Sequence, residues 1–326
     1  MKKLISTVLT IIMVYLMIPG VAASENTLAA NQNSDYIFEP EPTLSHEEIV
    51  AFLENSPNTQ QSSEYDVILQ EKNRAKNILA SNSATPSEQV NAKIILSFDP
   101  AKKVYQLQKK TDQELQGMGF STERIHLIRN FRGTDAEMQA LGATCSVGGN
   151  PKYTKNASGC WSKVTFAFSW SDIPIWQGTD ALVARSSTSY YSRVPDVKCT
   201  INYLTGTGTG QHIINKEYDA SHLSSNPWSD GNIAGFPFKF RIEDVAGIYR
   251  GTFYALSGMA TIVFVSNNPD VRLSYAYAQR KLDFDGSIGI NFSTAGVTGA
   301  LDFGLNGMTY VLLPNGGRAF DPYHFL

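Results

Sequence analysis

The fold class is decided by one stretch of eight residues, KVTFAFSW at positions 163–170. Its even positions, from Val164 to Trp170, are all apolar, whereas its odd positions, from Lys163 to Ser169, are polar or small. A period of two places alternate side chains on opposite faces of a strand. The stretch therefore predicts a half-buried β-strand with one face toward a core.

The same period of two recurs through the second half of the chain, at 236–242, 271–277 and 288–292. Further candidate strands lie near 180–194, 197–204, 210–218, 249–256, 259–265, 299–305 and 308–313. Short strands joined by Gly-rich turns are typical of antiparallel sandwiches. Residues 143–326 are therefore predicted to form a β-sandwich or jelly roll of about ten to twelve strands.

Upstream of this region the apolar period is that of helices. Four segments pair a hydroxyl residue with a Glu three positions later, at 45–48, 85–88, 111–114 and 134–137. In this capping box each side chain satisfies a backbone N–H at the other's position. Residues 44–142 are therefore predicted to be a helical module, and the chain is expected to be α+β, with helices and strands segregated along the sequence.

The last part of the predicted helical module contains two similar nine-residue segments. TDQELQGMG at 111–119 and TDAEMQALG at 134–142 share five of nine residues. The stretch 111–141 also carries Met118-Gly119-Phe120, Ile125, Ile128-Arg-Asn-Phe131 and Gly133. On these residues it resembles a segment that precedes β-rich regions in uncharacterised secreted proteins of Gram-positive bacteria. The resemblance implies no activity.

The N-terminus has the features of a bacterial export signal. Two Lys residues and an apolar run to Ile18 are followed by Val21 and Ala23, which fit cleavage before Ser24. Residues 1–23 are therefore predicted to be a signal peptide. The run is also long enough for an uncleaved span of about 20 residues, which is the alternative. We expect a protein secreted to the extracellular space, with association with the cell wall as a second possibility.

The rest of the chain is long enough for a sizeable core, and its charge excludes one class of partner. Residues 24–43 are polar and rich in Asn, and are predicted to be a disordered linker. Residues 24–142 hold 17 acidic and 11 basic side chains, and residues 143–326 hold 13 and 14. Neither part has the basic excess that binding to phosphate backbones requires, so nucleic acid is not an expected partner.

The sequence contains none of the common short catalytic motifs. G-x-S-x-G, H-E-x-x-H, the phosphate-binding P-loop and C-x-x-C are all absent. We therefore expect a non-catalytic binding or interaction protein without a cofactor. The alternative is an extracellular hydrolase whose site is dispersed over several strands, with residues 24–142 as a pro-segment that masks it.

Two tryptophans in turn-rich segments indicate a ligand site. A loop tryptophan offers a large rigid face beside polar groups, as ligand sites on β-sandwiches often do. The predicted binding residues are Trp176, Gln177, Asp180, Asn226, Trp228 and Asp230. The expected ligand is a glycan or another component of the cell envelope, and the oligomeric state is left open. In the structural alternative each tryptophan closes an end of the sandwich.

The cysteines and histidines give two further predictions. Cys145 and Cys160 flank a turn-rich stretch and are predicted to form a disulfide, with Cys160–Cys199 and three reduced thiols as alternatives. His212 and His222 are the weak candidates for a metal site. If 210–218 is a strand, its side chains alternate between two faces, so no metal site is expected.

A third class of function is membrane activity. Residues 286–301 carry no charge and alternate small polar with apolar side chains, which resembles the stem hairpins of β-pore-forming toxins. A strand that crosses a bilayer needs about 9–11 residues. An ordinary core hairpin has the same pattern, and otherwise no membrane contact is expected after signal cleavage.

Overall fold

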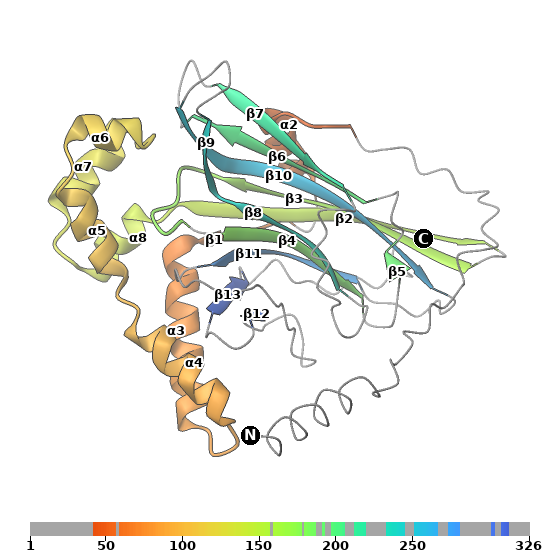
Figure 1. The fold of residues 1–326 in the computed structure, drawn as a ribbon, viewed down its shortest axis with the longest axis horizontal. Helices are drawn as coiled ribbons and strands as arrows, with labels where there is room; N and C mark the ends of the chain where they lie inside the picture. The colour runs from red at the N-terminus through yellow and green to blue at the C-terminus, as the bar shows by residue number, and fades with distance from the viewer. Residues whose placement is uncertain are drawn as a thin grey trace, which may run out of the picture. The chain divides into compact units, whose positions relative to one another are not determined.

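The structure is a computed structural model whose described residues belong to one compact unit that begins at Pro40 (Figure 1). The described residues are 42–56, 59–156, 159–177, 179–186, 191–192, 197–205, 212–219, 233–244, 251–266, 273–280, 301–303 and 308–312. The predicted signal peptide, nearly all of the predicted linker and the predicted strand at 288–292 lie outside these residues.

Helices occupy most of the N-terminal part of the described chain (Figure 1). They are α2 (His46–Asn55), α3 (Glu64–Ala80), α4 (Pro86–Ser97), α5 (Pro100–Gln108), α6 (Asp112–Gly117), α7 (Thr122–Asn130) and α8 (Asp135–Leu141). All four predicted capping boxes are confirmed, at the starts of α2, α4, α6 and α8. At α6, for example, Thr111 N donates to Glu114 Oε2 at 2.7 Å. The helices begin where the sequence predicts because their first backbone donors are satisfied locally.

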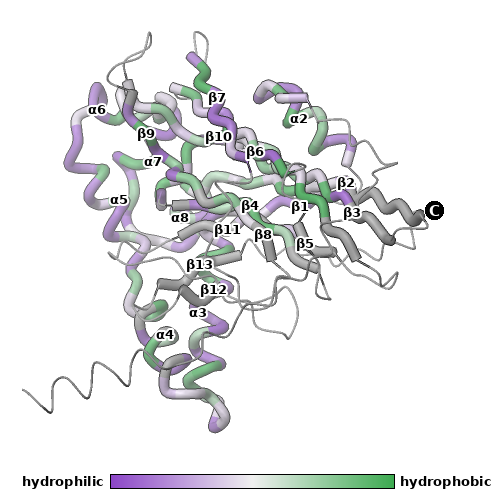
Figure 2. The backbone as a smooth tube through the Cα atoms, turned by 45° about the vertical axis from the view of Figure 1, so that its right-hand side comes forward, coloured by the Kyte–Doolittle hydropathy of each residue, from purple (hydrophilic) through white to green (hydrophobic). Residues whose placement is uncertain are grey.

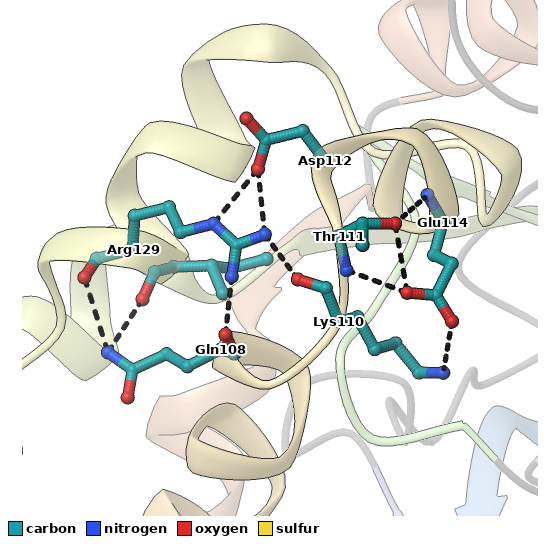
Figure 3. A network of polar contacts seen from close by, with 7 residues as sticks. Gln108, Lys110, Thr111, Asp112, Glu114 and Arg129 are labelled. Carbon is teal, nitrogen blue, oxygen red and sulfur yellow. Dashed lines mark hydrogen bonds and ion pairs between the residues drawn. The ribbon is translucent and has the colours of Figure 1, made fainter.

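One guanidinium group joins α5, α6 and α7 (Figure 3). Arg129 Nε and Nη2 donate to Asp112 Oδ1 at 2.9 and 2.7 Å. The Nη groups also donate to the carbonyl oxygens of Gln108 and Lys110, at the end of α5. Gln108 Nε2 in turn donates to Ile128 O at 2.9 Å. Carbonyls at a helix end have no partner within the helix, so this network satisfies them and ties three short helices together.

Within the described residues, eight strands form the antiparallel sheet A. Its order is β1 (Gln60–Ser63), β2 (Thr144–Asn156), β3 (Gly159–Trp170), β10 (Gly251–Ser266), β6 (Lys198–Leu204) and β7 (Ile213–Tyr218). Two more strands, β5 (Tyr191–Ser192) and β9 (Arg241–Asp244), pair with the two ends of β10. β10 is one strand with an irregularity between Ala255 and Ser257, where two strands were predicted. β1 comes from the region that was predicted to be only helical.

Five described strands form the antiparallel sheet B. Its order is β12 (Leu301–Phe303), β13 (Met308–Leu312), β11 (Leu273–Arg280), β4 (Thr179–Ser186) and β8 (Ile233–Lys239). The predicted strand at 236–242 is divided between the sheets, because β8 ends in sheet B and β9 begins in sheet A. Between them Phe240 is fully buried, and its carbonyl accepts from Ala255 N at 2.8 Å. One alternating pattern therefore serves both sheets.

Aromatic rings from the two sheets meet in one core. The ring centroids of Phe166 and Tyr275 are 5.3 Å apart, and those of Phe168 and Tyr277 are 4.5 Å apart. The even positions of the stretch 163–170 thus face sheet B. The same core cluster includes the helix residues Tyr65, Val104, Leu115, Ile128 and Leu141. Helices and sheets share a core, so the predicted domain boundary at 142 does not separate two compact units.

Strand β2 corrects the prediction of a turn-rich loop after Cys145. Gly148-Gly149-Asn150-Pro151 has the composition of a turn, yet this segment pairs with β3 residue by residue. A Cβ atom at Gly149 would lie 2.9 Å from both Phe166 Cβ and Tyr275 Cε1. Glycine occurs here because two ring-bearing residues approach the backbone closely, and not because the chain turns.

The fold therefore confirms the α+β class, with helices that precede antiparallel sheets. The finer prediction of a sandwich or jelly roll of about ten to twelve strands stays a prediction.

Replacing Gly149 with Ala should lower the free energy of unfolding by about 1–3 kcal/mol, because the added methyl group overpacks the contact with Phe166 Cβ and the Tyr275 ring. Gly117→Ala is the matched control, since no heavy atom lies within 4 Å of its Cβ position. The control should be neutral or stabilise by up to about 1 kcal/mol. Urea denaturation measures both variants, and equal stabilities would contradict the packing argument.

Candidate functional site

The segment between β3 and β4 connects the two sheets and contains the first predicted binding residues. Its backbone is bound by a carboxylate from α3. Glu64 is fully buried, and its Oε1 accepts from Trp176 N at 2.7 Å while its Oε2 accepts from Ile175 N at 3.0 Å. Glu64 N donates to Ala143 O at 2.8 Å. A buried carboxylate needs such donors, so this residue is a structural joint between helix and connection.

A second buried charged residue, Arg124 on α7, binds the same segment. Arg124 on α7 donates from Nη1 to Ile173 O at 2.6 Å and lies 3.2 Å from the carboxylate of Asp172. Its Nη2 donates to Leu141 O. The guanidinium also lies 5.6 Å from the centroid of the Phe120 ring. Helix α7 and the connection between the sheets therefore hold each other in place.

Trp176 is part of this joint and not an open platform. Its side chain is buried, its Nε1 donates to Pro100 O at 3.2 Å, and its ring stacks on Tyr65 at 6.3 Å. The half-buried Gln177 donates from Nε2 to Pro174 O at 3.1 Å, within its own turn. The predicted role of Trp176 in a surface ligand site is therefore wrong, and its structural alternative describes the contacts.

Asp180 is also enclosed. It is fully buried on β4 and accepts a hydrogen bond from the Tyr277 hydroxyl. That hydroxyl accepts from Trp170 Nε1 at 3.0 Å. Burial and the adjacent Asp180 carboxylate raise the pKa of Tyr277 well above its ordinary value, so the phenol stays protonated and donates. Asp180 serves this core network, which corrects its predicted role as a contact to ligand.

The other predicted site residues are placed as follows. Asn226, Trp228, Asp230 and His222 lie outside the described residues. His212 is exposed just before β7, and its backbone N donates to Thr205 Oγ1 at 3.2 Å. The described part of the chain contains no group of three or more His, Cys, Asp or Glu residues that could hold a metal ion.

The register of the sheets is incompatible with the predicted disulfide. Cys145 lies opposite Trp170, whereas Cys160 lies opposite Lys155, at the other end of the same hairpin. Ten residues of strand separate these positions by about 33 Å, whereas the Cα atoms of a disulfide lie within about 7 Å. Cys199 is opposite Ala260, six residues along β10 from the partner of Cys160, so the alternative pairing is also excluded.

Sheet A has a second face, turned away from sheet B. Because the even residues of β3 contact sheet B, Thr165 and Ser169 lie on this other face. The ladder extends the face across two strands, since Ser169 lies opposite Ser257 and Ser257 lies opposite Asn202. Asn202 Nδ2 donates to Ser257 Oγ at 3.3 Å. Four residues further along both strands, beyond the pair Ala167 and Met259, the hydroxyls of Thr165 and Thr261 are 3.1 Å apart.

We call this set of side chains the polar face. It consists of Thr165, Ser169, Thr200, Asn202, Ser257 and Thr261, none of them more than 7% exposed. The sequence signal was present in part, because Thr165 and Ser169 are the polar positions of the stretch 163–170. The irregularity in β10 lies between Ala255 and Ser257, so the period of two holds from Ser257 through Met259 to Thr261 and is broken only before Ser257.

A charged pair borders the polar face at the β7 edge. Lys198 Nζ lies 3.0 Å from Glu217 Oε1, and Thr43 Oγ1 donates to the same carboxylate oxygen at 2.9 Å. These two hydrogen bonds lower the pKa of Glu217 below its ordinary value. The border of the face is therefore an ion pair with a hydroxyl from the segment that precedes α2.

Comparisons with known proteins give little guidance. No protein-family model matches the sequence, and no curated protein matches it. Among the solved structures, eight chains match, and one is described as the Clostridium perfringens NetB toxin in the membrane inserted form. That match has 12% identity, covers 43% of this chain and 72% of the toxin chain, and has a TM-score of 0.15. Separately, no helix among the described residues has the length and apolar character to span a bilayer.

Replacing Glu64 with Ala should lower the free energy of unfolding by at least about 3 kcal/mol, since it leaves the buried amides of Ile175 and Trp176 without an acceptor. Glu123→Ala removes an exposed acidic residue from the first turn of α7 and should change stability by less than about 1 kcal/mol. Thermal and urea unfolding measure both. A Glu64 variant as stable as the Glu123 control would show that the joint is dispensable.

Proposed function

We propose that this chain is a secreted, non-catalytic binding protein whose ligand is a glycan of the cell envelope or the extracellular space. The scaffold that we infer is a β-sandwich, and the polar face of sheet A is the candidate binding surface. The observation that carries the proposal is the set of hydroxyl and amide groups aligned across β3, β10 and β6.

The chemistry of the polar face suits a polyhydroxyl ligand. Ser and Thr hydroxyls both donate and accept hydrogen bonds, and the Asn amide adds two donors and an acceptor. Sugar hydroxyls need the same mixture of donors and acceptors. The side chains project from the centre of a wide sheet, so little conformational freedom is lost when a ligand binds.

The packing of the helices favours a binding protein over a hydrolase with a pro-segment. In the hydrolase alternative, residues 24–142 would be removed. Residues of α3, α5, α6, α7 and α8 belong to the same hydrophobic cluster as the sheets, and β1 pairs with β2. Removal would expose that core and withdraw the Glu64 carboxylate from two backbone donors.

A comparison of two fragments tests this point. Residues 42–326 should be soluble and unfold cooperatively, because they keep the shared core, whereas residues 143–326 should lack fixed tertiary structure in near-UV circular dichroism. The protein in culture supernatant should begin near Ser24. A folded 143–326 fragment that hydrolyses an extracellular polymer would establish the alternative function.

A glycan array probed with the mature protein tests the ligand class. Replacing both Thr165 and Thr261 with Val keeps the β-branched shape and removes two hydroxyls from the polar face, so binding should weaken by about tenfold. Thr252→Val lies at the other end of β10 and is the control that should bind normally. Absence of glycan binding at both about pH 7.5 and about pH 5.5, or unchanged binding by the double variant, would refute the proposal.

A further inference from the structure

Helix α2 covers the outward side of sheet A, away from β4, β8 and β11 (Figure 2). Ile49 and Leu53, one helical turn apart, form a small cluster with Ala167 of β3 and Met259 of β10. This cluster is separate from the core that the other helices share with the sheets. In the register of the sheet, Met259 lies opposite Thr200, so α2 packs directly on the polar face.

The segment before α2 is tied to the same face by polar contacts. Asn202 Nδ2 donates to Leu44 O at 3.0 Å, and Lys198 Nζ donates to Thr43 Oγ1 at 3.0 Å. Asn202 belongs to the polar face, and Lys198 stands at its border. A ligand that binds the polar face and the α2 segment therefore compete for the same groups.

The docked helix leaves two buried polar atoms unsatisfied. Within the described part of the chain, Asn202 Oδ1 and His46 Nδ1 are buried and have no hydrogen-bond partner. A buried acceptor without a donor opposes the docked arrangement, and the apolar contact that favours it is a small cluster of four buried side chains with Leu44 and Phe52 packed against it. Small local units of this kind open without global unfolding.

We propose that α2 is a strap that occludes the polar face at neutral pH and leaves it when the solution is acidified, so that ligand binds the uncovered sheet. The inference rests on the proposed function, because it assigns regulation to the same binding surface. Release needs no covalent step, since α2 is held by side-chain packing and hydrogen bonds alone.

His46, in the first turn of α2, supplies the acid sensitivity. Burial lowers its pKa from the ordinary value of 6.5, and the carboxylate of Glu47 opposes this only in part. The positive end of the helix dipole also disfavours the imidazolium form. Because the pKa of His46 is lower in the docked state than in the released state, the docked helix has its full stability at pH values above about 6.5. This stability is lost as the pH falls through the docked-state pKa.

Among the described residues, the other charges near the strap come from α2, β3, β6 and β7. Glu48 belongs to α2 and is held in the capping box by Ser45, Lys163 lies on β3, and Lys198 is paired with Glu217 of β7. β10 contributes Ser257, Met259 and Thr261 to this face, none of which titrates in this range. His46 is therefore the group whose charge changes between neutral and mildly acidic pH.

Hydrogen exchange of the mature protein at about pH 7.5 and about pH 5.5, corrected for intrinsic rates, tests release. The amides of α2 should exchange at least about tenfold faster, relative to those of β10, at the lower pH. His46→Phe keeps a half-buried ring that does not titrate and should abolish this difference, whereas His126→Phe, at an exposed position of α7, should retain it. Equal α2 protection at both pH values in the unmodified protein would overturn the strap.

A second pair of variants separates the strap from the ligand. Ile49→Asp places a charge in the α2 cluster, and should release the helix and increase glycan binding at neutral pH by about tenfold. Ala51→Asp adds the same charge on the exposed side of α2 and should change neither. Protected β10 amides confirm that the variant remains folded. Release of α2 without any glycan binding would refute the proposed function, and binding with α2 still protected would refute the strap.

Discussion

Glu64 brings a carboxylate into the protein interior, where it accepts hydrogen bonds from the amides of Ile175 and Trp176. Those amides lie in the segment that leads from sheet A to sheet B, and the carboxylate belongs to the first residue of α3. Since β1 ends one residue earlier, the same position joins the edge of sheet A to the helices. A buried carboxylate is tolerated only where such donors surround it, so each partner fixes the other.

Arg124 repeats this arrangement from α7 with the opposite charge. It binds Ile173 O and Asp172 in the same connecting segment. Together the two charges hold the connection that carries Trp176, and the indole fills the space between α3 and Pro100. Helix α2 differs from the other helices because it has its own small cluster on the outside of sheet A. The molecule thus combines helices that share the main core with one helix that packs on a separate cluster.

The parts of the fold that depend on local contacts could be read from the sequence. The capping boxes formed because their partners lie three residues apart, and the even positions of the stretch 163–170 face sheet B as predicted. The strand is not half-buried, however, because its odd positions from Lys163 to Ser169 are buried as well. β2 could not be predicted in this way. The segment around Gly149 has the composition of a turn. The glycine is required because the ring of Tyr275, which is distant in the sequence, approaches the backbone closely.

The same distinction explains the errors at the candidate site. Trp176 stands in a turn-rich segment, but Tyr65 and Pro100, which bury it, come from distant helices. The polar face could be predicted in part, because Thr165 and Ser169 alternate with apolar residues in the sequence, but the pairing that brings Ser257 and Asn202 beside them is set by the sheet register. When the contacts of a residue come from distant parts of the sequence, its own segment carries no pattern that predicts them.

Native-state hydrogen exchange in increasing urea tests the central claim that the Glu64 joint makes helices and sheets one cooperative unit. The account predicts that amides of α3 and α7 and amides of β3 and β10 reach the same free energy of opening, with α2 below them. Opening of α3 and α7 at a distinctly lower free energy than β3 and β10 would contradict it, because the helices would then form a separate unit.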